Sequence, residues 1–154
     1  MWYSLGMKLK NTTDLPNELI REIIRFVRPP GIRNFDVMVK NNLTGHYLGG
    51  HAFMYGSDYH DRKRTPFVVL RVTPRMNRPR RHWTYQYGQL KGRRYYLANR
   101  EEVLVYLAAH ELRHLWQAKT RNKAGYAWGS RGRFSEIDTD SYAIGKLREW
   151  RRRS

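Results

Sequence analysis

Hydrophobic residues recur at helical spacing in three separate segments of the chain. Residues 14–30 carry apolar side chains at three- and four-residue intervals, which predicts an amphipathic helix, and a Pro-Pro-Gly sequence ends the segment. Residues 100–119 are apolar over most of their length, which predicts a largely buried helix capped by Asn99. A third helix is expected from residue 135 to about residue 153.

Short segments with strand-like patterns precede the first helix and occupy the sequence between the first two helices. The expected strands or extended segments lie at residues 1–13, 35–39, 43–55, 66–73 and 95–97, with a loop or twisted hairpin at 74–94. The segment 66–73 is continuous and β-branched, and it starts at a proline, as an edge strand can. We therefore expect residues 67–73 to offer an edge for an extended ligand.

The order of these elements predicts an α+β fold. An N-terminal helix is followed by a small mixed sheet of three to five strands, a central helix and a C-terminal helix. A length of 154 residues fits one domain spanning residues 1–154, and the sequence shows no internal repeat.

Composition narrows the class of protein further. The five Trp and eleven Tyr argue against disorder, and the absence of Cys leaves His and carboxylates as the ligands for any zinc. No signal peptide and no long apolar span are recognised, so we expect a cytoplasmic monomer that does not enter a membrane.

A formal net charge of +17 suggests a polyanionic partner. Basic clusters at residues 62–64, 78–81 and 151–153 are either ordinary solvated surface or contacts for phosphate. Nucleic acid or another polyanion is therefore one expected partner. A basic nucleic-acid-associated module, with a structural metal or none, is the alternative to an enzyme.

The chemistry is concentrated in the sequence His110-Glu111-Leu112-Arg113-His114 of the central helix. Residues four apart on a helix share a face, so His110 and His114 can direct two imidazoles at one metal ion. Glu111 lies beside them and can handle a metal-bound water without ligating the metal. The plainer interpretation is an exposed helix stripe with solvated histidines, which the apolar flanks disfavour.

A third ligand is expected from the last helix, because catalytic zinc usually takes three protein ligands. Glu136 and Asp140 are four apart and share a helix face, whereas Asp138 is turned away from them. We assign Glu136 as the third ligand, and Asp140 as the acceptor for the free N–H of a ligating imidazole, that of His110. Acids in a first helical turn also occur without any metal.

The sequence His110–His114 followed by Glu136 and Asp140 resembles the gluzincin metallopeptidases, particularly their minimal single-domain members. The order of expected elements is also similar to a zincin-like core. The chain departs from the pattern at Thr139, where many members carry Ala, and no separate C-terminal subdomain, which larger gluzincins use to close the cleft, is recognised in these residues. A protease acting on nucleic-acid-bound proteins, similar to the SprT-like proteases, is an alternative that would unite the metal motif with the charge. Those proteases use a third His, however, and this chain has none after His114.

The resemblance implies a zinc metallopeptidase, an endopeptidase rather than an exopeptidase, that holds one Zn²⁺ and cleaves a peptide or protein. A zinc-bound water would be activated by Glu111, which would pass the proton to the leaving amine. The residue that stabilises the oxyanion is left open, and the candidates are Tyr142, Tyr126, His51 and His82.

Overall fold

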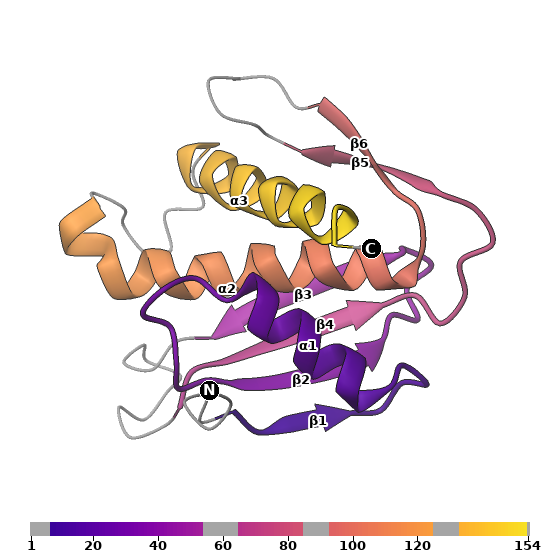
Figure 1. Cartoon of the computed structure of the whole chain (residues 1–154), viewed down its shortest axis with the longest axis horizontal. Coiled ribbons are helices and arrows are strands. Elements are labelled where there is room, and N and C mark those ends of the chain that lie inside the picture. Colours follow the sequence, from indigo (N-terminus) through magenta and orange to yellow (C-terminus); the bar gives the residue numbers. More distant parts are fainter. Residues whose placement is uncertain (1–6, 54–64, 85–92, 125–132, 154) are drawn as a thin grey trace.

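The computed structural model describes residues 7–53, 65–84, 93–124 and 133–153. Its elements are, in order, β1 (Leu9–Asn11), α1 (Asn17–Val27), β2 (Asp36–Asn41), β3 (Leu48–Phe53), β4 (Phe67–Val72), β5 (Arg80–Thr84), β6 (Arg93–Leu97), α2 (Arg100–Ala124) and α3 (Arg133–Arg151). This is an α+β fold, as the order of apolar patterns predicted (Figure 1).

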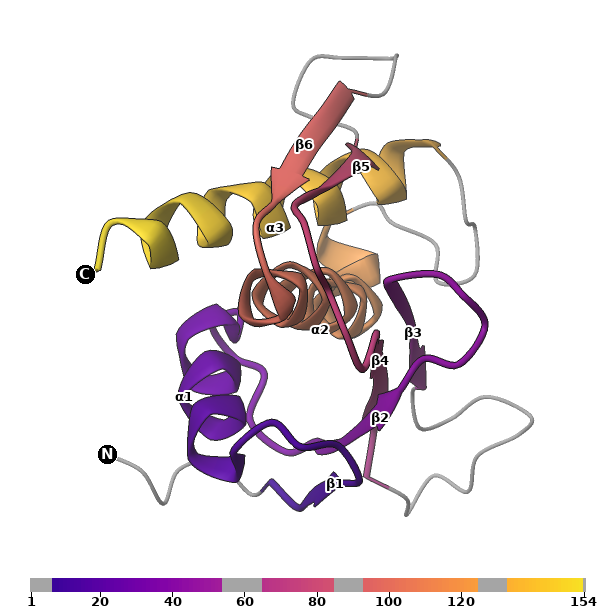
Figure 2. The ribbon, with the colours of Figure 1, turned by 90° about the vertical axis from the view of Figure 1, so that its right-hand side faces the viewer.

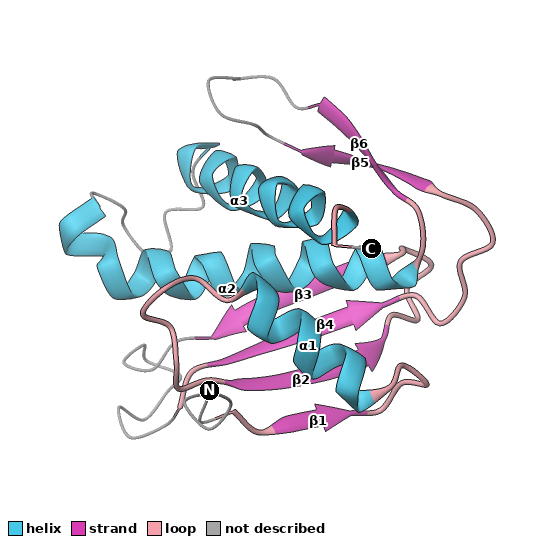
Figure 3. Cartoon of the chain, in the orientation of Figure 1, coloured by secondary structure: helices cyan, strands magenta, loops and turns pink. Residues whose placement is uncertain are grey.

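The main sheet has four strands in the order β1-β2-β4-β3. Strands β1, β2 and β4 are mutually parallel, and β3 runs antiparallel to β4 at one edge. The parallel pair β1 and β2 needs a crossover connection, which α1 provides. Strands β5 and β6 form a separate antiparallel hairpin (Figure 3).

Helix α2 is the central element of the core. Its residues from Val103 to Ala109 are all buried, so it needs cover on every side. Figure 2, which looks nearly along α2, shows the sheet and α1 on one side of it, and α3 with the β5–β6 hairpin on the other. Among the described residues, no helix combines the length and apolarity that a membrane crossing requires.

The N-terminal end of α2 has the expected cap, whereas the C-terminal end of α2 and the N-terminal end of α3 extend further than expected. The Asn99 side chain accepts a hydrogen bond from the Glu102 amide at 2.9 Å, which confirms the predicted cap. Glu102 in turn accepts the Ala98 amide at 2.9 Å, so two exposed amides are satisfied reciprocally. Helix α2 continues to residue 124 instead of 119, and α3 starts two residues before position 135.

The expectation that residues 67–73 form an edge strand is wrong. Strand β4 lies between β2 and β3 and pairs with both along its length. Its nearly continuous apolar sequence is typical of a strand covered on both faces. The preceding Pro66 does not require an edge, because it lies before Phe67, the first residue that β4 pairs with either neighbour, so its missing N–H removes no bond of that ladder. The edge strands of the sheet are β1 and β3.

Candidate metal centre

The two histidines of α2 meet on one face of the helix. His110 and His114 are one turn apart, and their Nε2 atoms lie 3.2 Å from each other. Their side chains are 15% and 17% exposed, so both are accessible at one side while the helix around them is buried. The pattern of residues four apart therefore places two imidazole nitrogens at one point, as predicted.

Glu136 reaches the same point from α3. Its two carboxylate oxygens lie 3.3 Å from the Nε2 atoms of His110 and His114, respectively. In the part of the chain that the structure describes, these three residues form the one group of His and carboxylate side chains that could share a metal ion. The expected ligand set is therefore assembled from two helices that are joined by residues outside the described ranges.

Asp140 holds His110 from the side opposite to this group. The Nδ1–H of His110 donates to Asp140 Oδ1 at 2.9 Å, and the Tyr106 hydroxyl donates to the same oxygen at 2.5 Å. Asp140 is 5% exposed and therefore fixed by its surroundings. A proton held on Nδ1 leaves the Nε2 lone pair of His110 available for a metal ion. The expected contact of Asp140 with His110 is present.

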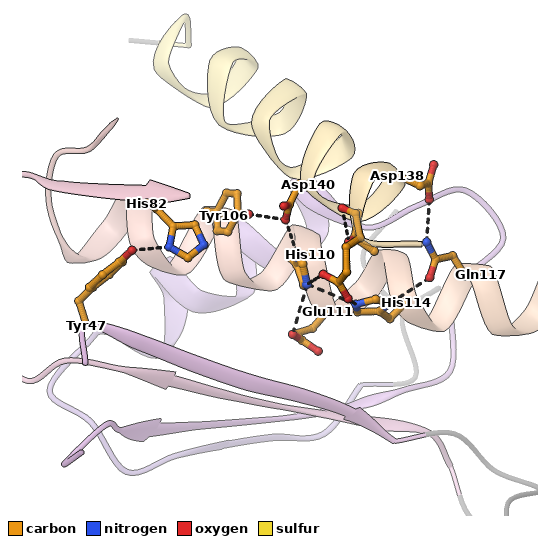
Figure 4. A network of polar contacts seen from close by, with 11 residues as sticks. Tyr47, His82, Tyr106, His110, Glu111, His114, Gln117, Asp138 and Asp140 are labelled. Atoms are coloured by element: carbon orange, nitrogen blue, oxygen red, sulfur yellow. Dashed lines mark hydrogen bonds and ion pairs between the residues drawn. The ribbon is translucent and has the colours of Figure 1, made fainter. Parts of the chain in front are cut away.

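His114 is held in the same manner through two side chains (Figure 4). Its Nδ1–H donates to Gln117 Oε1 at 2.9 Å, and Gln117 Nε2 donates to Asp138 Oδ2 at 3.0 Å. Asp138 also accepts two hydrogen bonds from Arg113, at 2.8 and 3.0 Å. Asp138 is thus turned away from the ligand group, as expected, and it positions Gln117, whose oxygen must then face His114.

Glu111 lies beside the ligand group but outside it. Its Oε1 is 4.0 Å from His110 Nε2, and its side chain is only 8% exposed. Strand β3 passes directly against it at Gly50, where a Cβ atom would lie 3.1 Å from Glu111 Cγ and 3.2 Å from Oε1. The absence of a side chain at Gly50 therefore makes room for the Glu111 carboxylate between α2 and β3.

The electrostatics of the group favour a positive charge at its centre. Burial lowers the pKa of His110, but its hydrogen bonds with Asp140 and Glu136 outweigh burial and raise the pKa to about 10. Burial raises the pKa of Glu136, but hydrogen bonds with His110 and His114 prevail and lower it strongly. Burial and the nearby Asp140 charge raise the pKa of Tyr106 well above its usual range. A proton or a metal cation would meet the same need for positive charge.

A line of polar and aromatic side chains extends from the site to the hairpin. The Tyr47 hydroxyl forms a short hydrogen bond with Nδ1 of His82, which is in β5. The His82 ring contacts the Tyr106 ring edge-to-face, with centroids 5.0 Å apart, and Tyr106 bonds Asp140 (Figure 4). Burial lowers the pKa of His82, which favours its neutral form. The hairpin is therefore seated against the residues that orient His110.

Of the four candidates for oxyanion stabilisation, Tyr142 and His82 have side chains that the structure describes, and neither belongs to the ligand group. Tyr142 is on α3, and its hydroxyl donates to the Val27 carbonyl at the end of α1, at 2.5 Å. His51 has its backbone in β3, opposite Val69, and its side chain is outside the described part of the structure. Tyr126 lies outside the described residues altogether. Tyr142 thus joins α3 to α1 instead of facing the ligands.

Three residues of the site were missed in the sequence: Tyr106, Gln117 and Gly50. A signal existed for the first two, because they lie four residues before His110 and three residues after His114, and such positions share a helix face. No local signal identifies Gly50, whose role depends on β3 packing against α2. Comparison of the chain with protein-family models, with curated proteins and with solved structures finds no match, so the geometry of these residues is the basis for assigning a function.

Proposed function

We propose that this protein is a zinc-dependent metallopeptidase in which His110, His114 and Glu136 hold the metal and Glu111 is the general base. The observation that carries the proposal is the convergence of two imidazole nitrogens and one carboxylate, with separations of 3.2 and 3.3 Å. Ligands at zinc–ligand distances of about 2.0–2.1 Å in a tetrahedron lie roughly 3.3 Å apart. Each imidazole nitrogen is at about this spacing from the other nitrogen and from one of the two Glu136 oxygens, which supports a tetrahedral zinc site.

The type of donor also favours zinc over the common hard cations. Ca²⁺ and Mg²⁺ prefer six or more oxygen ligands, whereas two of the three donors here are imidazole nitrogens. Three protein ligands leave one position open, which is the arrangement of catalytic zinc sites. Asp140 and Gln117, on the far sides of the two rings, keep both Nε2 atoms directed at the shared point.

Glu111 has the properties of a general base for hydrolysis. Its carboxylate is close to the ligand group without belonging to it, and it is nearly buried. Zinc, when bound, would polarise a water molecule and the scissile carbonyl. Glu111 would accept the proton of the attacking water and deliver it to the nitrogen of the leaving amine as the C–N bond breaks.

Strand β3 supports an extended peptide as the substrate. It is an edge strand, and no strand among the described residues pairs with its outer side. Gly50 brings the β3 backbone against Glu111, so a peptide added along this edge would run past the general base. Binding along a strand edge, with chain continuing in both directions, favours an endopeptidase.

Two variants and one matched control test the proposal. Glu136→Gln should abolish stoichiometric zinc binding, measured by elemental analysis after dialysis, because one of three ligands loses its charge. Glu149→Gln makes the same change on the same helix at an exposed residue that pairs with Lys146, and it should retain zinc. Glu111→Gln should retain zinc and lose about 10²- to 10⁴-fold of the activity on an unfolded protein substrate.

The pattern of losses distinguishes the metal site from the reaction. Zinc retained in Glu136→Gln would remove this residue from the ligand set. Wild-type activity in Glu111→Gln, with zinc present, would exclude Glu111 as the base and with it the proposed mechanism.

A further inference from the structure

One long segment of the chain contains no acidic residue. Residues 62–100 include twelve of the thirty Lys and Arg residues and none of the thirteen Asp and Glu residues. The segment spans β4, β5 and β6 and the connection between the sheet and the hairpin. Basic charge is therefore concentrated in one segment of the sequence, and the proposed peptidase site does not use it.

The two faces of the β5–β6 hairpin differ in what they contact. His82 and Tyr95 are opposite each other in the register, and their side chains face the body of the protein. His82 contacts Tyr106, and the Tyr95 hydroxyl accepts a hydrogen bond from Arg151 at 3.2 Å. Because side chains alternate across a strand, Arg81 and its partner Tyr96 occupy the outer face.

Arg81 and Tyr96 form an exposed cationic and aromatic pair. The Tyr96 side chain is 50% exposed, one of two large hydrophobic residues in the described structure that remain so open. Arg81 lies 4.9 Å from the centre of the Tyr96 ring and donates to its hydroxyl at 2.7 Å. Arg94, two residues before Tyr96, is on the same face and is also exposed. An open ring thus lies between guanidinium groups.

The arginines leading into β5 extend this surface. Arg75 and Arg78 are exposed, and among the described residues no ion pair joins them or Arg81 to a carboxylate. Elsewhere in the fold, by contrast, Arg151 is neutralised by Glu102 at 2.5 Å. Within the part of the chain that the structure describes, Arg75, Arg78 and Arg81 therefore carry positive charge that no carboxylate neutralises. We call Arg75, Arg78, Arg81, Arg94 and Tyr96 the hairpin surface.

We propose that the hairpin surface binds single-stranded nucleic acid, with a base stacked on Tyr96 and the backbone phosphates near the arginines. Alternating cationic and aromatic groups match a strand whose phosphates and unpaired bases are both accessible. A duplex offers phosphates but keeps its bases stacked inside, so it would leave the Tyr96 ring without a partner. This inference does not depend on the proposed peptidase activity, because none of the metal ligands belongs to the surface.

The test measures binding of a fluorescently labelled 12-nucleotide oligo-dT by anisotropy at several salt concentrations. The Glu111→Gln protein should bind like the wild type, which separates this proposal from the peptidase. Tyr96→Ala should weaken binding about 5- to 150-fold, the range for loss of one stacked base, while Tyr96→Phe should bind like the wild type. Equal losses in Tyr96→Ala and Tyr96→Phe, with both proteins folded by circular dichroism, would overturn the stacking contact.

The charged part of the surface is tested with a matched pair of double variants. Arg75→Gln with Arg78→Gln should weaken binding and reduce the slope of log affinity against log salt by about 1.4, at roughly 0.7 for each phosphate contact. Arg21→Gln with Arg33→Gln removes the same charge from exposed positions on and after α1, on the other side of α2 (Figure 1). Equal effects of the two pairs would reduce the binding to net charge and refute a specific surface. Tighter binding to a 12-base-pair duplex, or to phosphatidylserine vesicles, would refute single-stranded nucleic acid as the partner.

Discussion

Replacement of Asp140 by Asn tests whether the residues behind the ligands control metal affinity. The change keeps the shape of the side chain and leaves all three proposed ligands in place. It removes the negative charge that accepts hydrogen bonds from His110 Nδ1 and from the Tyr106 hydroxyl. Hydrogen bonds to a charged acceptor are roughly twice as strong as neutral ones, so both contacts should weaken.

The size of the effect follows from the geometry. The His110 contact is 2.9 Å long and largely shielded from water, since Asp140 is 5% exposed. Loss of such a contact behind a ligating imidazole typically lowers metal affinity about 10- to 100-fold, equivalent to about 1.4–2.7 kcal/mol. Tyr106→Phe removes the other donor but leaves the carboxylate on His110, so it should change zinc affinity less than Asp140→Asn does.

The assay is a competition titration of zinc against a chromophoric chelator at constant pH. Asp36→Asn serves as the matched control, because among the described residues the Asp36 side chain accepts the Lys8 amide, at a distant, partly exposed position in β2. Wild-type zinc affinity in a folded Asp140→Asn protein would refute the view that Asp140 sets the tautomer and orientation of His110. A larger loss in Tyr106→Phe than in Asp140→Asn would refute the ranking of the two contacts.

Two further changes probe the packing around the site. A Cβ atom at Gly50 would lie 2.9 Å from Leu107 Cδ1, so Gly50→Ala should lower the free energy of unfolding, measured in urea, by about 1–3 kcal/mol. A Cβ atom at Gly49 would meet nothing nearer than 3.7 Å, so Gly49→Ala should lower it less. Equal losses in the two variants would contradict the close packing of β3 on α2. Burial opposes the ionisation of Glu102, but hydrogen bonds from Arg151 prevail and lower its pKa in the folded state. At pH values above the unfolded-state pKa of about 4.3, Glu102→Gln should therefore lower the free energy of unfolding by about 1 kcal/mol. This difference from the wild type should vanish as the pH falls through the lower pKa of the folded state. A difference that persists in acid would exclude the ion pair as its cause.

The elements that depend on local sequence were predicted well. The Asn99 cap of α2 and the apolar residues that bury the helix are close together in the sequence, so both can be recognised locally. The four-residue spacing of His110 and His114 places them on one face of the helix. Glu136 and Asp140 were predicted because they are four residues apart, so one face of a second helix can offer both carboxylates to the histidines of α2. In each case the decisive geometry lies within a single helix.

The wrong prediction about β4 and the two missed residues Gln117 and Gly50 all concern relations between elements. Strand β4 was placed at an edge because Pro66 begins it, but the partners of a strand are decided by the whole sheet. Gln117 takes its role from Asp138, which reaches it only when α3 packs on α2. The same holds for Gly50, whose neighbour Glu111 is 61 positions along the chain.

The position of Glu136 on a different helix from His114 has a consequence for folding. A metal ion held by both would link two points 22 residues apart in a chain that has no cysteine and therefore no disulfide. By the chain-entropy account of cross-links, closing a loop of this length restricts the unfolded chain by roughly 3 kcal/mol. The ion would then act as a reversible cross-link between α2 and α3. Its removal would lower the stability of the folded protein as well as abolish the proposed peptidase activity.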